Sequence, residues 1–214
     1  VSFVATVVSL PLAIWVAWML ARRDFRGKTL VSALVHLPLV LPPVVTGYLL
    51  LIVFGRNGAI GAALDDVFGV VLAFRWTGAA LAAAIMGFPL MVRAIRLAIE
   101  AVDPKLEDAA ATLGAGPWAV FRVVTLPLIA PGILAGVTLG FAKAMGEFGA
   151  TITFVANIPG ETQTLPSAIY AFLQVPGGEG AALRLVGLSV VVAIGAVVVS
   201  EILARRVLRR ASGQ

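Results

Sequence analysis

Five long apolar runs divide this chain of 214 residues and restrict its fold more than any other feature. A helix rises about 1.5 Å per residue, so about 20 apolar residues cross the ~30 Å hydrocarbon core of a bilayer. Hydrophobic residues make up 60% of the chain and charged residues 13%, against about 45–50% and about 25% in soluble domains. The sequence therefore predicts an all-α, polytopic transmembrane helical bundle with five spans: Val1–Ala21, Leu30–Phe54, Thr77–Ile99, Leu128–Ala156 and Ala181–Leu203.

Helix-breaking residues predict irregular structure in and between these spans. Pro38, Pro42 and Pro43 fall within the second run, which we therefore expect to form a kinked or broken helix covered by its neighbours. Between the second and third runs, Gly55–Arg75 mixes glycine with apolar residues and predicts a short interfacial or re-entrant helix. Before the fifth run, Pro166–Gln174 predicts a second short helix.

The basic residues give the orientation, because Lys and Arg concentrate in cytoplasmic loops. The net charge is +5. Of the 16 Lys and Arg residues, twelve fall on one side of the five spans, three on the other, and Lys143 lies inside a span. The side with twelve is expected to be cytoplasmic, which places residue 1 outside and the C-terminus inside. The twelve are Arg22, Arg23, Arg26, Lys28, Arg93, Arg96, Lys105, Arg122, Arg205, Arg206, Arg209 and Arg210; the three are Arg56, Arg75 and Arg184.

Residues for catalysis or metal binding are scarce. The chain has no cysteine and one histidine, His36, so neither a metal site nor a Ser–His–acid arrangement is expected. Gly114–Ala119 fits the G-x-G-x-x-A dinucleotide pattern, but no strand precedes it and Pro117 lies within it. The sequence contains no basic face interleaved with aromatic residues, so a nucleic-acid partner is not expected. We therefore expect a membrane protein without catalytic residues, metal or cofactor of its own.

A polar segment at about residues 100–127 joins the third and fourth runs and is the most informative loop. Asp103 followed by Pro104 is an N-cap with proline at the first helical position, and Gly114 is a stop signal. A second short helix is expected from Pro117, with Pro127 ending it before the fourth span. Two short helices joined at a glycine suit a groove on a partner protein, although an amphipathic loop lying on the membrane explains the pattern equally well.

The spacing in this segment resembles the cytoplasmic EAA loop of ABC-importer permeases. The pattern reads Asp108-Ala109-Ala110, then Gly114, then Val124 and Leu126-Pro127, with Asp replacing Glu and Val replacing Ile. The resemblance implies a type I ABC importer fold, with residues 1–214 as one permease domain and the helix before Gly114 as the coupling helix that docks on an ATP-binding subunit. Glu107 and Asp108 are both expected to point outward, and either can carry the acidic position.

Two charges inside the fourth run are the next candidate site. Lys143 and Glu147 are four residues apart, close enough to pair on a helix, and intramembrane charges mark functional sites by default. They are expected either to hold helices together near a cytoplasmic vestibule or to contact the solute in a translocation path. Gly146, Gly149 and Thr151 belong to the same candidate site, the glycines because they let helices approach closely.

The sequence that follows resembles the tetrahedral-oxyanion branch of these permeases. The residues that carry this resemblance run from Gly146 to Thr162. The run Ala150–Tyr170, including Asn157, Pro159, Glu161 and Thr162, is most similar to molybdate permeases, with sulfate, thiosulfate and tungstate as alternative solutes. Those four residues are candidates for docking a binding protein.

The same resemblance implies the partners and the location of the chain. They are a homodimer in the lipid of a bacterial inner membrane, two cytoplasmic ATP-binding subunits that hold ATP and Mg, and a periplasmic molybdate-binding protein. A stand-alone secondary transporter is the less favoured alternative, because it needs several ionisable residues along the midplane.

Overall fold

The computed structural model describes residues 1–211, with the backbone alone for Arg205 and residues 207–211. Every regular element in this part of the chain is helical, as the apolar runs predict. In chain order the elements are α1 (Ser2–Arg22), α2 (Lys28–Val40), α3 (Pro43–Phe54), α4 (Ala59–Phe68), α5 (Trp76–Glu100), α6 (Pro104–Thr112), α7 (Pro117–Val120), the π-helix η1 (Phe121–Thr125), α8 (Leu126–Met145), α9 (Gly149–Val155), α10 (Leu165–Leu173) and α11 (Glu179–Ala211).

Four helices of the described chain are long and apolar enough to cross a membrane: α1, α5, the continuous stretch Pro117–Met145, and α11 over Glu179–Ala204. The pair α2 and α3 provides a fifth if counted as one broken span, because the two helices meet at an angle of 115°. The break follows from Pro42, which lacks an amide hydrogen and restricts the residue before it to extended backbone. The predicted broken helix is therefore confirmed.

The fourth predicted span differs from the structure at both ends. The expected run Leu128–Ala156 is not one helix, because α8 ends at Met145 and α9 begins at Gly149. At its other end Pro127 does not end the preceding helix, which continues from Pro117 into α8. The π-helical turn explains the continuity: Leu126 N–H donates to Phe121 O five residues back, which widens the helix just where the ring of Pro127 would crowd an ordinary turn.

The central packing unit is made by α1, α5 and α8. Its buried side chains include Ala17 and Leu20 from α1, Ile95 and Ile99 from α5, and Ile129 from α8. Glycines at a four-residue spacing on α8, namely Gly132, Gly136 and Gly140, face α5 at close range. Small residues of this kind let transmembrane helices approach closely, which replaces the hydrophobic driving force that lipid cannot supply.

Gly87 on α5 provides a test of this packing. A Cβ there would lie 2.8 Å from the carbonyl oxygen of Gly140, so Gly87→Ala must separate α5 from α8. We expect a loss of about 1–3 kcal/mol of stability, seen as a lower unfolding temperature in detergent. Gly195→Ala on α11 is the control, because nothing lies within 4 Å of its Cβ position. Equal unfolding temperatures for the two variants would contradict the close packing.

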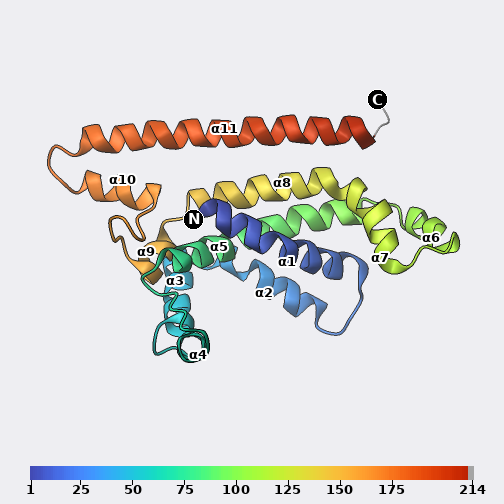
Figure 1. Ribbon diagram of the computed structural model, residues 1–214, viewed down its shortest axis with the longest axis horizontal. Coiled ribbons are helices and arrows are strands. Elements are labelled where there is room, and N and C mark those ends of the chain that lie inside the picture. The colour runs from blue at the N-terminus through green and yellow to red at the C-terminus, as the bar shows by residue number, and fades with distance from the viewer. Residues whose placement is uncertain (212–214) are drawn as a thin grey trace.

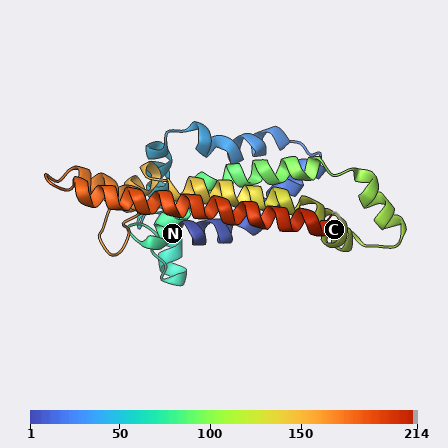
Figure 2. The same ribbon diagram turned by 90° about the horizontal axis from the view of Figure 1, so that it is seen from above.

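The two ends of the molecule differ in what they carry. Figure 1 shows the α1–α2 connection, α6, α7 and the C-terminal end of α11 at one end, and α4, α9, α10 and the N-terminus toward the other. Figure 2 shows α6 extending beyond the ends of α5 and α8. The loops that hold most of the predicted cytoplasmic Lys and Arg residues therefore lie together, although the side chains of Arg205, Arg209 and Arg210 lie outside the described residues.

Candidate functional site

The α6 helix, which includes the Asp-Ala-Ala sequence, begins and ends as the sequence predicts. Asp103 Oδ1 accepts a hydrogen bond from Lys105 N at 3.0 Å, and Pro104 is the first helical residue. At the other end Gly114 has φ +87°, and its N–H donates to Ala111 O at 3.0 Å. The next N–H, of Ala115, donates to Ala110 O at 3.2 Å, which completes a Schellman cap. These bonds fix α6 as a separate, projecting helix.

The two neighbouring carboxylates of α6 do different things, which corrects the expectation that both point outward. Glu107 points back into the protein, where its Oε2 lies 3.2 Å from Arg22 Nε on α1 and its Oε1 accepts from Thr125 Oγ1 at 2.6 Å. Arg22 also donates from Nη2 to Val102 O at 3.1 Å. Asp108 is exposed. Glu107 therefore fastens α6 to α1 and η1, and Asp108 is the carboxylate that a partner could touch.

The remaining residues of the predicted motif lie where α7 joins α8. Val124 lies half-buried in η1, Leu126 is half-buried at the first position of α8, and Pro127 is exposed beside it. Because η1 is continuous with α8, α7 is joined to α8 without a break in the helix. The loop is thus mechanically connected at two places, through Glu107 to α1 and through η1 to α8.

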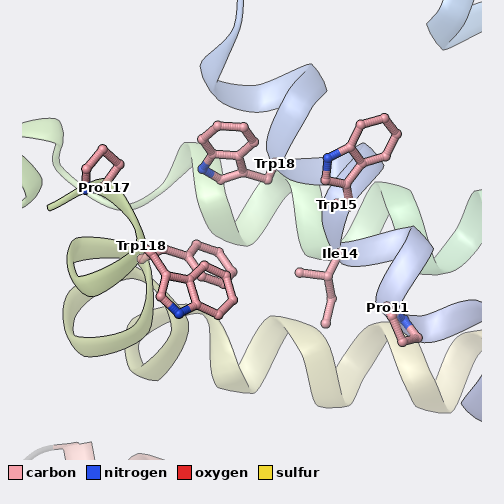
Figure 3. Close-up of a pocket in the computed structure, with 7 residues that line it drawn as sticks. Pro11, Ile14, Trp15, Trp18, Pro117 and Trp118 are labelled. Carbon is pink, nitrogen blue, oxygen red and sulfur yellow. The ribbon is translucent and has the colours of Figure 1, made fainter.

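An aromatic cavity of about 460 Å³ separates α7 from α1, and sequence reasoning did not anticipate it. Figure 3 shows Trp118 of α7 opposite Trp15 and Trp18 of α1, with Ile14 and Pro11 further along. Trp118 stacks on Phe121 with ring centroids 5.7 Å apart. Tryptophan prefers the boundary between lipid and water, so this group indicates where the bundle leaves the membrane.

The intramembrane pair forms as the four-residue spacing predicts. Lys143 Nζ donates to Glu147 Oε2 at 2.9 Å, and the Glu147 side chain is 1% exposed. Glu147 has a second task, because its Oε1 accepts from Ala150 N at 2.9 Å and so caps the first turn of α9. The pair lies at the end of α8 away from α6.

The short helix α9 packs closely on α3 through glycine. A Cβ on Gly149 would lie 2.7 Å from Pro43 Cβ, and one on Gly47 would lie 2.5 Å from Ala150 O. Thr151 is buried and its hydroxyl donates to Phe148 O at 2.9 Å, within its own helix. Gly146 is exposed at the end of α8. The structure thus brings the two short helices α3 and α9 together beside Glu147.

The four residues proposed for binding-protein docking do not share one environment. Pro159 and Glu161 are exposed on the connection between α9 and α10. Thr162 is buried, its Oγ1 accepting from Ile158 N at 2.9 Å and donating to Ala156 O at 3.3 Å, so it shapes the turn and cannot touch a partner. Asn157 is half-buried, with an Oδ1 that has no hydrogen-bond partner among the described residues. Docking through Thr162 was therefore a wrong expectation.

Comparison with known proteins gives consistent results in sequence and in fold. The family described as binding-protein-dependent transport system inner membrane component matches residues 9–209. The molybdenum transport system permease protein ModB of Escherichia coli (strain K12) is 60% identical over 205 residues, which cover 96% of this chain and 90% of that protein. The sulfate transport system permease protein CysT of the same strain is 38% identical over 173 residues, covering 81% of this chain and 62% of that protein.

Two solved structures share the architecture at low identity. A chain of the bacterial ABC transporter that imports the acidic polysaccharide alginate aligns with a TM-score of 0.71 at 21% identity, covering 96% of this chain and 77% of that chain. A chain of the inward-facing MetNI methionine ABC transporter aligns with a TM-score of 0.70 at 16% identity, covering 96% and 88%. Together with the sequence match, the type I importer fold places this chain in the family of binding-protein-dependent transport system inner membrane components.

Proposed function

We propose that this chain is the membrane subunit of an ATP-driven molybdate importer. The observation that carries the solute is the 60% identity, over 96% of the chain, to a permease named for molybdenum transport. The lower identity to a sulfate permease makes sulfate or thiosulfate the second candidate, and tungstate follows from its chemical similarity to molybdate. A stand-alone secondary transporter is disfavoured by the family, whose members work with a binding protein.

In this proposal residues 1–214 form one permease domain that pairs with a second copy of itself. Two ATP-binding subunits contact it on the cytoplasmic side and a periplasmic molybdate-binding protein contacts it on the other. The nearly uncovered helix α11 leaves apolar side chains for lipid or for the second copy. ATP and Mg bind to the partner subunits, and this chain supplies the path and the coupling.

The coupling surface in the proposal is the projecting helix α6 with the turn at Gly114. Leu106 and Leu113 are exposed there beside Asp108, and Leu113 is 89% exposed. Exposed leucines next to a carboxylate suit a partner groove that is apolar with a basic rim. Closure of the ATP-binding subunits would move α6, and the Glu107–Arg22 contact and η1 would carry that movement into α1 and α8.

The orientation follows from the positive-inside rule. The end that holds the α1–α2 connection, α6 and α7 faces the cytoplasm, so residue 1 is outside and the C-terminus inside. The exposed Pro159 and Glu161 then face the periplasm together with α4, where a binding protein can reach them. Glu147, Gly149 and Thr151 lie toward the same outer side, where reorientation of α3 against α9 would open and close the path.

Reconstituted transport tests the solute. The chain would be co-purified with its ATP-binding partner, placed in liposomes and supplied with ATP inside and the loaded binding protein outside. We expect ATP-dependent uptake of molybdate at a rate at least tenfold above that of sulfate at equal concentration. Equal or faster sulfate uptake would reassign the solute, and uptake that needs neither ATP nor a binding protein would overturn the importer proposal.

A further inference from the structure

Two adjoining cavities lie between α2 and the last turns of α5, apart from α6 and from the Lys143–Glu147 pair. Their volumes are about 400 Å³ and about 460 Å³, and they share Ser32, His36 and Arg96. We call the two together the α2–α5 cavity. It lies at the end of the molecule that also holds the α1–α2 connection, which the proposed orientation makes cytoplasmic.

The lining of the α2–α5 cavity is basic. Arg93, Arg96 and Lys28 contribute three cations, and Glu100 is the one carboxylate in the lining. Arg96 Nε donates to Glu100 Oε1 at 2.7 Å, and Lys28 Nζ donates to Asp24 Oδ1 at 2.9 Å. Arg93 has no carboxylate partner within residues 1–211. One guanidinium is thus left to attract an anion, and Arg96 keeps its other N–H groups for a second contact.

Neutral hydrogen-bond donors complete the lining. The Ser32 and Thr29 hydroxyls line the α2 side. His36 Nδ1 lies 2.7 Å from Ser32 O, a carbonyl oxygen that only accepts, so the imidazole uses this nitrogen as a donor within α2 and its neutral form adds no donor to the cavity. Guanidinium and hydroxyl groups around the cavity are the donors that a tetrahedral oxyanion needs for its four oxygens.

We infer that the α2–α5 cavity binds the transported tetrahedral oxyanion on its way to the cytoplasm. This inference rests on the proposed function, and it adds an intermediate binding site near the exit of the path. A lipid phosphate has similar chemistry, but Ala33 and Leu97 are the two purely apolar side chains in the lining, so acyl chains find no groove there. A dissolved oxyanion fits the lining better than a lipid headgroup.

The Arg96–Glu100 contact makes the site weak, as transport requires. A conducting pathway must bind its solute well enough to accept it and weakly enough to release it. Glu100 neutralises part of the charge of Arg96 and repels an anion that lingers beside it. Millimolar affinity therefore suits this arrangement, whereas capture at low concentration is left to the binding protein.

Thermal unfolding of the complex tests the site directly. The permease with its ATP-binding partner would be held in phosphatidylcholine nanodiscs, without binding protein, and titrated with molybdate, tungstate or sulfate against chloride at constant ionic strength. A ligand that binds the native state raises its unfolding temperature, and 10 mM of a millimolar ligand should give a rise of about 3 °C. Arg93→Gln should remove this rise, and Arg93→Lys should retain part of it.

The control variant is Arg26→Gln, an exposed arginine in the α1–α2 connection at the same end of the molecule that does not line the cavity. It should keep the full rise in unfolding temperature. A rise in unfolding temperature that survives in Arg93→Gln would overturn the inference. The measurement would also be repeated in phosphatidylglycerol nanodiscs. If this lipid blocked the oxyanion effect and co-purified with wild type but not with Arg93→Gln, the site would bind a lipid headgroup and the inference would be overturned.

Transport separates this inference from the proposed function. Arg93→Gln should lower the maximal rate of uptake about tenfold and leave the KM for the loaded binding protein unchanged, because the site lies after that step. Molybdate uptake at wild-type rates in Arg93→Gln would contradict the proposed exit site but would not contradict the importer assignment. An Arg93-dependent rise with sulfate, without any molybdate uptake, would keep the site and change the solute.

Discussion

Glu147→Ala, in the short connection between α8 and α9, should abolish most transport and strongly destabilise the chain. The side chain is 1% exposed and bonds both Lys143 Nζ and Ala150 N at 2.9 Å, so its loss leaves a cation and the first turn of α9 without a partner. Removing one member of a buried ion pair costs about 3–5 kcal/mol. We expect a fall in uptake of at least tenfold in liposomes and a clearly lower unfolding temperature in detergent.

The two bonds of Glu147 can be separated by substitution. Glu147→Gln keeps an oxygen for Ala150 N–H and loses the charge, so it should be less harmful than alanine. Exchanging the two charges, with Lys143→Glu and Glu147→Lys together, should not restore function, because a lysine at 147 cannot accept the Ala150 bond. Full rescue by the exchange would show that the ion pair alone matters.

The Asp24–Lys28 pair supplies a matched control. It has the same four-residue spacing and the same 2.9 Å distance, but the Asp24 side chain is 98% exposed. The Lys28 ammonium lowers the pKa of Asp24 through a hydrogen bond and its charge. Water screens such a surface pair, so Asp24→Asn should leave the unfolding temperature almost unchanged. A comparable loss in both variants would mean that burial does not set the importance of Glu147.

Local signals in the sequence were enough to place α6 and the break in the second span. Asp103, Pro104 and Gly114 act within a few residues of their own position, through a cap, a fixed φ and a positive φ. The four-residue spacing of Lys143 and Glu147 is equally local. Such features can be predicted from the sequence because they depend on residues close together in the chain and not on tertiary packing.

Contacts between distant segments could not be predicted in the same way. Glu107 forms an ion pair with Arg22, although the helices α2 to α5 separate the two residues in sequence. The sequence around either residue contains no signal that predicts this contact. Thr162 looks like a loop residue in sequence, yet the turn buries it. The π-helical turn before Pro127 is a further case, because proline normally signals a helix end and only the wider turn lets the helix continue. The contacts by which Glu107 holds α6 on α1 and η1 are therefore visible only in the structure.

Gly114→Val should uncouple ATP hydrolysis from transport while the protein still inserts and folds. Gly114 has φ +87°, which an L side chain adopts at a cost of about 1–2 kcal/mol, more for a β-branched residue. The change should distort the Schellman cap and turn α6 away from its proposed partner groove. We expect the ATPase activity stimulated by the loaded binding protein to fall about tenfold, with basal hydrolysis by the partner subunits retained.

Gly114→Asn separates backbone conformation from size. Nothing lies within 4 Å of a Cβ at this position, so neither substitution meets a neighbour within the chain. Asparagine tolerates the left-handed region far better than valine, so Gly114→Asn should keep most of the stimulated activity despite its larger polar side chain. If asparagine and valine were equally harmful, the glycine would be required for space against the partner and not for its φ angle. If both were harmless, the α6 turn would play no part in coupling.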